Sequence, residues 1–306
     1  MQIVFVDAND TLARIADRLR EADWPLTINR QPDITSDQLP AVIGEAEVAI
    51  IDHTHFPLEI ARQCRNLKDV IFLGTGPRSY MDPDALQAEL DIKVHIIKGY
   101  GDTAVAEFAI SLMWAAAKGL PSMDRGMREG QWLRTDGVQL AGKTLGLIGY
   151  GSIAAEVGKI ARGVGMKVVA WNRSPKEADG VTFLPLEEVL ASTDVLSLHL
   201  LLTDETRDFL SAERLAMMKP GAILINTARG AVVDEGAMIA RLASGELRAA
   251  GLDVYNVEPL PADHPLTRLP NVVLSAHSAF RTPEANDNLI EMAFDHYRRI
   301  GTRVSA

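Results

Sequence analysis

Three residues in the last third of the chain could together carry out proton and anion chemistry. Arg229, Glu258 and His277 each come shortly after an apolar, β-branched run of the kind that forms buried strands. A planar guanidinium can bind a carboxylate and polarise a neighbouring carbonyl. A histidine can exchange a proton near neutral pH, and an adjacent carboxylate orients its ring and favours its charged form. Hydride transfer to a 2-oxo acid requires these groups.

Each of the three residues also has a purely structural interpretation. Arg229 could donate hydrogen bonds that fix a loop, Glu258 could be a solvated turn residue, and His277 could be a satisfied histidine at a strand end. The catalytic interpretation depends on all three meeting at the carboxyl ends of late strands, where open α/β sheets build their sites.

A glycine-rich segment, Gly149-Tyr-Gly-Ser-Ile-Ala154, lies between an expected strand at 144–148 and an expected helix at 153–162. Its first glycine allows a tight turn, its second lets a pyrophosphate approach the backbone, and Ala154 permits close helix–strand packing. The anion would bind the N–H groups at the start of the helix. Because a second strand follows at the required spacing, the segment predicts a dinucleotide site with Gly149, Gly151, Ser152 and Ile153 as ligands.

The residues after that second strand indicate which dinucleotide binds. Enzymes that use NAD place an acidic residue there, about 20 residues beyond the glycine loop, to bind the ribose 2′-hydroxyl. This chain has Asn172, Arg173 and Ser174 instead, and a guanidinium with a hydroxyl suits a 2′-phosphate. We therefore expect NADP. The alternative is NAD, with Asn172 on the 2′-hydroxyl and Arg173 in solvent.

Short apolar strands alternate with helical patterns along the whole chain, which predicts an α/β fold of parallel sheets covered by helices on both faces. The expected strands of the first part are 2–6, 47–51, 69–73 and 92–96, with helices at 10–21 and 57–64. The second part is expected to contain six strands, as in a complete dinucleotide-binding sheet. They are 144–148, 167–171, 195–198, 222–226, 249–254 and 272–274.

Two of the expected helices have patterns that bear on where they pack. The segment 103–118 is apolar around nearly its whole circumference, with Glu107 and Ser111 as its inner polar residues. It is therefore expected to be buried on every side, at a junction of domains or subunits or in the core of one domain. The last helix, at 283–300, could pack back on the first domain.

Composition limits the class of protein. The 306 residues suggest two domains, and 47% hydrophobic with 24% charged residues is typical of a globular chain. With 31 basic and 41 acidic residues the net charge is −10, which argues against nucleic acid as the main ligand. A single cysteine, Cys64, fits a reducing compartment. The amino terminus lacks the basic region of a signal peptide, and no apolar run approaches bilayer length, so we expect a cytoplasmic protein without membrane association.

Several segments resemble the D-isomer-specific 2-hydroxyacid dehydrogenase family, which includes phosphoglycerate dehydrogenases and glyoxylate/hydroxypyruvate reductases. They run in the family's order and cover most of the chain. The matching segments are 73–76, 103–107, 140–153, 218–230, 252–259 and the residues around His277. The family's catalytic arginine, glutamate and histidine fall on Arg229, Glu258 and His277.

The resemblance implies two doubly wound parallel-sheet domains. They are a flavodoxin-like substrate-binding domain, residues 1–100 with 281–306, and an inserted NAD(P)-binding Rossmann domain, residues 101–280. The N–H groups of Gly74, Thr75 and Gly76 would bind the substrate carboxylate. The residues implied to lie beside the nicotinamide are Leu200, Leu201, Thr227, Ala228 and Asp253, the last near its carboxamide. Family members are usually dimers, so we expect a homodimer.

We therefore expect NADPH-dependent reduction of a small 2-oxo acid to the (R)-2-hydroxy acid, with glyoxylate or hydroxypyruvate as substrate. Protonated His277 would donate to the carbonyl oxygen, Arg229 would bind the substrate, and Glu258 would keep His277 protonated. One alternative is a phosphoglycerate dehydrogenase-like NAD enzyme, disfavoured because no third, regulatory domain is expected. The other is a catalytically weak protein of the same fold that senses dinucleotides.

Some residues depart from the family's pattern or stand outside it. Leu201 replaces a usual proline, and Ser278-Ala279 replaces frequent glycines. Arg78 follows the Gly74–Gly76 segment and could contact an anionic substrate. Two histidines in Asp52-His-Thr-His55 are too few for a metal site, so we expect no metal and place His53 and His55 at the substrate pocket. His199 is expected to be a satisfied buried histidine.

Overall fold

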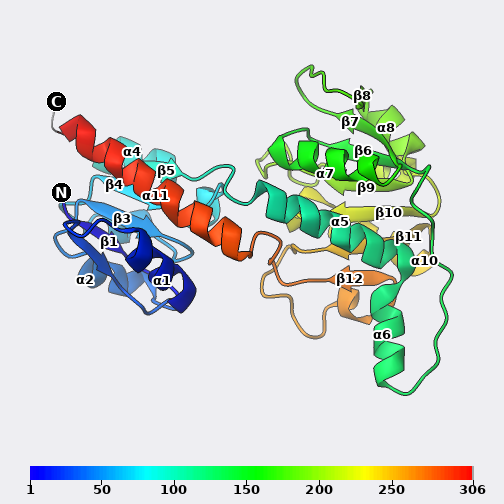
Figure 1. Ribbon diagram of the computed structural model, residues 1–306, viewed down its shortest axis with the longest axis horizontal. Helices are drawn as coiled ribbons and strands as arrows, with labels where there is room; N and C mark the ends of the chain where they lie inside the picture. The colour runs from blue at the N-terminus through cyan, green and yellow to red at the C-terminus, as the bar shows by residue number, and fades with distance from the viewer. Residues whose placement is uncertain (305–306) are drawn as a thin grey trace. The chain divides into compact units, whose positions relative to one another are not determined.

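The computed structural model describes residues 1–304, with side chains described through residue 302 (Figure 1). The chain forms two compact units: Met1–Gly101 with Arg281–Ala306, and Asp102–Phe280. Each unit contains one wholly parallel sheet flanked by helices. The expectation of two parallel-sheet α/β domains is therefore confirmed.

The first unit has a five-stranded sheet in the order β2-β1-β3-β4-β5, which is the flavodoxin-like order. Successive residues of β1 point to opposite faces, so that Ile3 packs with α1 and α11 whereas Val4 packs with α2, α3 and α4. The elements are β1 (Ile3–Phe5), α1 (Asp10–Leu19), β2 (Leu26–Ile28), α2 (Leu39–Ile43), β3 (Val48–Ile51), α3 (Leu58–Ala61), β4 (Asp69–Phe72), α4 (Pro83–Leu90), β5 (Lys93–Ile96) and α11 (Pro283–Val304).

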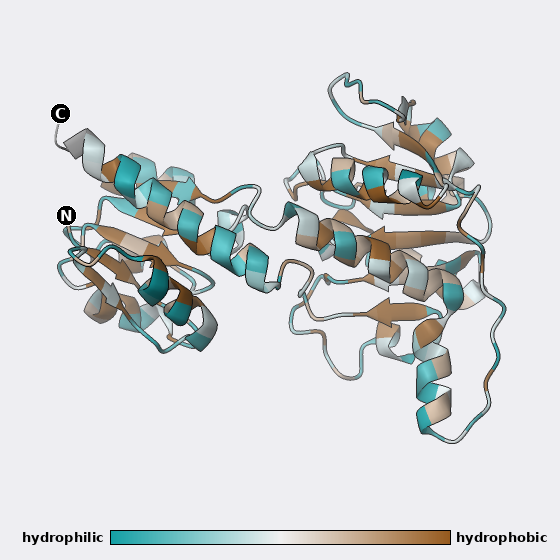
Figure 2. Ribbon diagram, viewed as in Figure 1, coloured by the Kyte–Doolittle hydropathy of each residue, from teal (hydrophilic) through white to brown (hydrophobic). Residues whose placement is uncertain are grey.

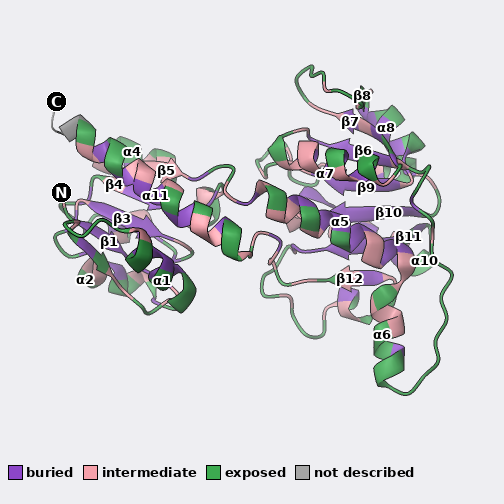
Figure 3. Ribbon diagram, viewed as in Figure 1, coloured by how far each residue is buried: buried purple, intermediate pink, exposed green. Residues whose placement is uncertain are grey.

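The second unit has a seven-stranded sheet in the order β12-β11-β10-β9-β6-β7-β8. Its central strands are hydrophobic and buried (Figures 2 and 3) because helices cover both faces. The elements are α5 (Asp102–Lys118), α6 (Leu120–Arg128), β6 (Thr144–Ile148), α7 (Ser152–Gly163), β7 (Lys167–Trp171), β8 (Thr182–Phe183), α8 (Leu186–Ser192), β9 (Val195–Leu198), α9 (Ala212–Met217), β10 (Ala222–Asn226), α10 (Glu235–Ser244), β11 (Leu247–Leu252) and β12 (Val272–Leu274).

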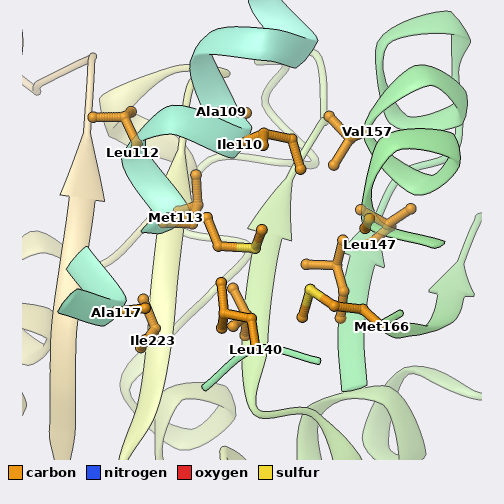
Figure 4. Packing of buried hydrophobic residues seen from close by; sticks show 14 of the residues in the cluster. Ala109, Ile110, Leu112, Met113, Ala117, Leu140, Leu147, Val157, Met166 and Ile223 are labelled. Atoms are coloured by element: carbon orange, nitrogen blue, oxygen red, sulfur yellow. The ribbon is translucent and has the colours of Figure 1, made fainter. Parts of the chain in front are cut away.

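Helix α5 lies beside α7 on one face of this sheet. Its Ile110 and Met113 face Leu147 of β6 and Val157 of α7 in the core (Figure 4). Glu107 and Ser111 are exposed, so the chain itself buries only part of the helix, contrary to the expected burial on every side. The placement of α5 in the core of one unit matches one of the expected positions.

The structure corrects several expected elements. The second sheet has seven strands rather than six, because β8 adds two residues at its edge. Strand β2 and helices α2 and α4 were not expected, since elements of three to eight residues show too little periodicity. Strand β11 ends at Leu252, two residues before the expected end, which places Asp253 in the loop that follows.

No single helix within residues 1–304 is long and apolar enough to cross a membrane. Helices α5 and α6 meet the length and composition test only as a pair, which is bent by 67°.

Candidate active site

The site is built on three neighbouring strands of the second unit. In register, Asn226 at the end of β10 lies beside Leu252 of β11, and Leu252 lies beside Leu274 of β12. Arg229, Glu258 and His277 lie on the loops that leave these three strand ends. The parallel register thus brings the three predicted catalytic residues to one edge of the sheet.

His277 and Glu258 form a direct pair. The Nδ1 atom of His277 lies 2.7 Å from Oε2 of Glu258, and the Tyr255 N–H donates to Oε1 over 2.9 Å. Both side chains are about one-third exposed, at 37% and 34%. The imidazole is therefore oriented by the carboxylate, while its partly exposed ring can meet a ligand.

The electrostatics of Glu258 connect all three residues. Burial acts to raise the pKa of this carboxyl group, but hydrogen bonds from His277 and Tyr255, together with the charges of His277 and Arg229, lower it overall. Glu258 is therefore a carboxylate at neutral pH. It places a negative charge 2.7 Å from Nδ1 of His277.

Arg229 is held by a turn that begins with a buried amide. Asn226, 2% exposed, donates from Nδ2 to the Arg229 carbonyl and accepts the Ala228 N–H on Oδ1, over 2.9 and 3.0 Å. The guanidinium donates to the Ala228 carbonyl over 2.6 Å. Its remaining donors can bind a carboxylate.

The loop that carries His277 is fixed by Asp253. The His277 backbone has φ = 47°, a left-handed conformation that is uncommon outside glycine. Its N–H donates to the Asp253 carbonyl. The Asp253 carboxylate accepts the Ser275 hydroxyl and the N–H groups of Ser278 and Ala279 over 2.6 to 2.9 Å. Asp253, expected beside the nicotinamide carboxamide, thus binds the His277 loop with most of its acceptor sites.

Two further residues shape the site without having been predicted. A methyl group on Gly230 would lie 2.0 Å from the Tyr255 carbonyl carbon, so the backbone leading to Glu258 passes directly over this glycine. The Tyr255 hydroxyl bridges the carbonyls of Leu252 and Ser275, which joins the ends of β11 and β12. The roles of Gly230 and Tyr255 were hardly indicated by the sequence, because a close approach between two backbone segments leaves no periodic pattern in it.

The glycine loop has the form that a pyrophosphate requires. Gly149 has φ = 82°, and a side chain there would lie 2.7 Å from the His199 carbonyl oxygen. A side chain on Gly151 would enter open space, so this is where a ligand can approach the backbone. The first helical bond of α7 is from Ala155 N–H to the Gly151 carbonyl, so the N–H groups of Ser152 and Ile153 point ahead of the helix. These residues fit a dinucleotide.

The residues expected beside the nicotinamide have different environments. The Thr227 hydroxyl is buried and has no hydrogen-bond partner within residues 1–304, which marks a position where a ligand would satisfy it. Leu200 packs against Gly149, Ala228 lies in the Arg229 turn, and Leu201 is 70% exposed.

The residues expected at the ribose follow β7. Asn172 Oδ1 accepts the Tyr150 N–H over 3.0 Å, and Asn172 Nδ2 donates to the Ser174 carbonyl over 2.8 Å. This asparagine ties its turn to the glycine loop. Arg173 is 83% exposed and forms an ion pair with Glu205 at 3.1 Å.

The segment Gly74–Gly76, which is expected to bind the substrate carboxylate, follows β4 in the first unit. Nearby, His55 and Arg78 line a cavity of about 410 Å³ within that unit, and Arg78 forms an ion pair with Asp84 at 2.5 Å. His53 instead contacts Asp52, and the hydrogen bond with this carboxylate raises the pKa of His53 to about 9.

Two remaining expectations concern histidines and metals. Burial lowers the pKa of His199 to about 4, and its Nε2 lies 3.0 Å from Ser197 Oγ, as expected of a satisfied histidine. Within the described residues no group of three or more histidine, cysteine or acidic side chains could hold a metal ion.

With this geometry in place, comparison with known proteins gives a clear result. Residues 110–279 match the family model described as D-isomer specific 2-hydroxyacid dehydrogenase, NAD binding domain. A hydroxypyruvate reductase of Thermotoga maritima is 35% identical over 305 residues, covering 97% of this chain and 98% of that protein. The chain belongs to the D-isomer-specific 2-hydroxyacid dehydrogenase family. It is an oxidoreductase acting on CH–OH groups that uses a nicotinamide dinucleotide.

Two further members of this group of relatives are informative. A glyoxylate reductase of Aeropyrum pernix is 41% identical over 220 residues, covering 68% of this chain and 66% of that protein. A solved structure of an acyclic imino acid reductase in complex with NADPH and D-Arg aligns with a TM-score of 0.87 at 26% identity. The alignment covers 99% of this chain and 98% of that one.

Proposed function

We propose that this dehydrogenase reduces small 2-oxo acids, glyoxylate and hydroxypyruvate first, to (R)-2-hydroxy acids with NADPH. The observation that carries the proposal is the His277–Glu258 pair at the strand ends that also position Arg229. The names of the full-length and partial relatives, hydroxypyruvate reductase and glyoxylate reductase, support the choice of substrate.

The catalytic roles follow from the donors and acceptors present. Arg229 binds the substrate carboxylate and polarises the carbonyl at C2. His277, protonated and oriented through Nδ1 by Glu258, donates the proton on Nε2 to the carbonyl oxygen. The reduced nicotinamide, when bound, supplies the hydride that adds to C2. His277 then takes up a proton from solvent, while the Glu258 carboxylate stays charged.

We assign the second unit to cofactor binding and the first unit to substrate binding. Gly149, Gly151, Ser152 and Ile153 would hold the pyrophosphate, and the buried Thr227 hydroxyl would hydrogen-bond the cofactor. Arg173 and Ser174, with Asn172, would hold the ribose 2′-phosphate. Gly74, Thr75 and Gly76 keep the role of presenting N–H groups to a carboxylate.

The test is a steady-state assay of the purified chain with NADPH or NADH and a panel of 2-oxo acids. We expect the highest kcat/KM with NADPH and either glyoxylate or hydroxypyruvate. A clear preference for NADH would overturn the cofactor assignment and leave the reductase assignment standing. Binding of cofactor without turnover of any acid in the panel would overturn the reductase assignment.

A further inference from the structure

The turn after β7 brings two cations to the glycine loop. Asn172 holds this turn against Tyr150 by the hydrogen bonds described above. From the same turn, Lys176 donates from Nζ to the Tyr150 carbonyl over 2.6 Å. Arg173 lies between Asn172 and Lys176 in the chain, so the region that would receive the ribose carries two positive side chains.

Arg173 already forms an ion pair with a carboxylate from another part of the chain. Glu205 Oε2 lies 3.1 Å from Arg173 Nη1, and the two side chains are 77% and 83% exposed. Glu205 belongs to the segment after β9. That segment is closed by Thr206, whose hydroxyl accepts the Thr203 N–H over 2.7 Å and donates to the Leu201 carbonyl over 2.5 Å. The carboxylate is therefore presented from a structured turn.

We propose that Glu205 is a specificity-determining residue that competes with the ribose 2′-phosphate for Arg173 and so limits the preference for NADPH over NADH. The inference rests on the proposed use of NADPH. A bound 2′-phosphate carries close to two negative charges at neutral pH and offers several acceptor oxygens, so it displaces the single carboxylate from the guanidinium. Displacement weakens binding of the phosphorylated cofactor, whereas the neutral 2′-hydroxyl of NADH does not require it.

The effect is expected to be modest and dependent on salt. Exposed ion pairs are weak, so Glu205→Gln should tighten NADPH binding by about two- to fivefold. NADH binding should stay within about twofold of wild type. Screening by added salt should reduce the difference between the variant and the wild type.

The experiment is isothermal titration calorimetry of NADPH and NADH against the full chain, at low and high salt, without substrate. Asp204→Asn is the matched control, because it removes the same charge from the same segment and leaves the Arg173–Glu205 pair in place. Arg173→Gln, alone and combined with Glu205→Gln, completes a double-mutant cycle. The gain from Glu205→Gln should disappear when Arg173 is absent.

Each outcome decides one of the two proposals. If Glu205→Gln and Asp204→Asn change NADPH affinity equally, the proposed competition between Glu205 and the 2′-phosphate is wrong, because the loss of any negative charge from this segment would explain the result. Weaker NADPH binding by Glu205→Gln would also overturn the competition, because Glu205 would then position Arg173 for the phosphate. If Arg173→Gln leaves the ratio of NADPH to NADH affinity unchanged, the assignment of Arg173 to the 2′-phosphate fails, and the competition fails with it. If Arg173→Gln changes the ratio of NADPH to NADH affinity but Glu205→Gln does not, the proposed use of NADPH stands and the competition by Glu205 is wrong.

Discussion

At the scale of single residues, the site depends on charges and acceptors that hold one histidine. Glu258 orients His277, and Asp253 fixes the left-handed loop on which His277 lies. The sequence predicted the first relation, both from the chemistry of a carboxylate beside a histidine and from family resemblance. It did not predict the second, because Asp253 was expected beside the cofactor, and its bonds to Ser278 and Ala279 depend on a loop conformation that no local pattern encodes.

Glu258→Gln tests the electrostatic role of the carboxylate. The amide keeps a hydrogen-bonding group beside His277 but removes the negative charge that lies next to the ring. Because Glu258 stays charged to a pH below its ordinary pKa of 4.5, kcat/KM of the variant should be about 10-fold below wild type at neutral pH, and the difference should shrink as the pH falls through the lowered pKa of Glu258. The measurement is kcat/KM for the 2-oxo acid across pH, and equal values for the two proteins at neutral pH would contradict the role.

At the scale of elements, most strands could be predicted and the shortest could not. Strands β6, β7, β9 and β10 have the predicted bounds because each is a short, mainly apolar run that is largely buried in the sheet. The two-residue β8 offered no such run. The close packing of loops over Gly230 was equally hidden, since it depends on register between β10 and β11.

Gly230→Ala should disrupt the site through the backbone. The added methyl group would overlap the Tyr255 carbonyl carbon, so the Glu258 loop must move away from His277. We expect kcat to fall by at least about 100-fold, since misplaced catalytic groups cost rates of that order. The matched control is Gly163→Ala at the end of α7, where a methyl group meets no neighbouring atom within 4 Å. Wild-type kcat in the Gly230 variant would show that the loop tolerates the methyl group.

Asp194, just before β9, binds Thr144 of β6 and Lys219 ahead of β10, and this should make folding sensitive to acid. Burial acts to raise the pKa of this carboxyl group, but Lys219 at 2.5 Å and the Thr144 N–H lower it overall. The ionised form therefore stabilises the fold above the ordinary pKa of 3.8, and this contribution is lost as pH falls through the lower pKa of the folded state.

Asp194→Asn measures this contribution. Urea unfolding should show a loss of about 1 kcal/mol at pH 7, shrinking as the pH is lowered below 4. Asp263→Asn, at an exposed position, serves as the control for charge alone. A loss of unfolding free energy that is as large below pH 4 as at pH 7 would contradict the electrostatic explanation.

At the scale of the whole molecule, the chain has two α/β units, and several large apolar side chains are exposed on the second of them. The parallel-sheet fold could be predicted from the alternation of strands and helices. The exposed apolar side chains on α6 and the loop after it could not be predicted, because that segment shows no distinctive sequence pattern. Helix α6 is largely exposed (Figure 3), and the large hydrophobic side chains exposed on it and the loop after it are Leu120, Met127, Trp132 and Leu133. Exposed apolar patches of this kind mark interaction surfaces. We therefore keep the prediction of a homodimer and place its contact at this region.

Light scattering during size-exclusion chromatography tests the homodimer. The wild type should elute with twice the chain mass of 33.3 kDa. Trp132→Glu should shift the mass toward the monomer, because the side chain is 73% exposed in the single chain and would be buried in the dimer. Met217→Glu, exposed elsewhere, should have no effect on mass. A monomeric wild type at micromolar concentration would contradict the prediction.

The most direct test of the central claim is the separation of turnover from cofactor binding in His277→Asn. Asparagine tolerates the left-handed backbone at this position and can still hydrogen-bond Glu258, so the substitution removes the proton donor with little change to the loop. We predict that kcat for reduction of glyoxylate or hydroxypyruvate falls by about 10²- to 10⁴-fold, while NADPH affinity measured by calorimetry changes by less than about threefold. A variant that keeps wild-type turnover would contradict the role of His277 as the proton donor.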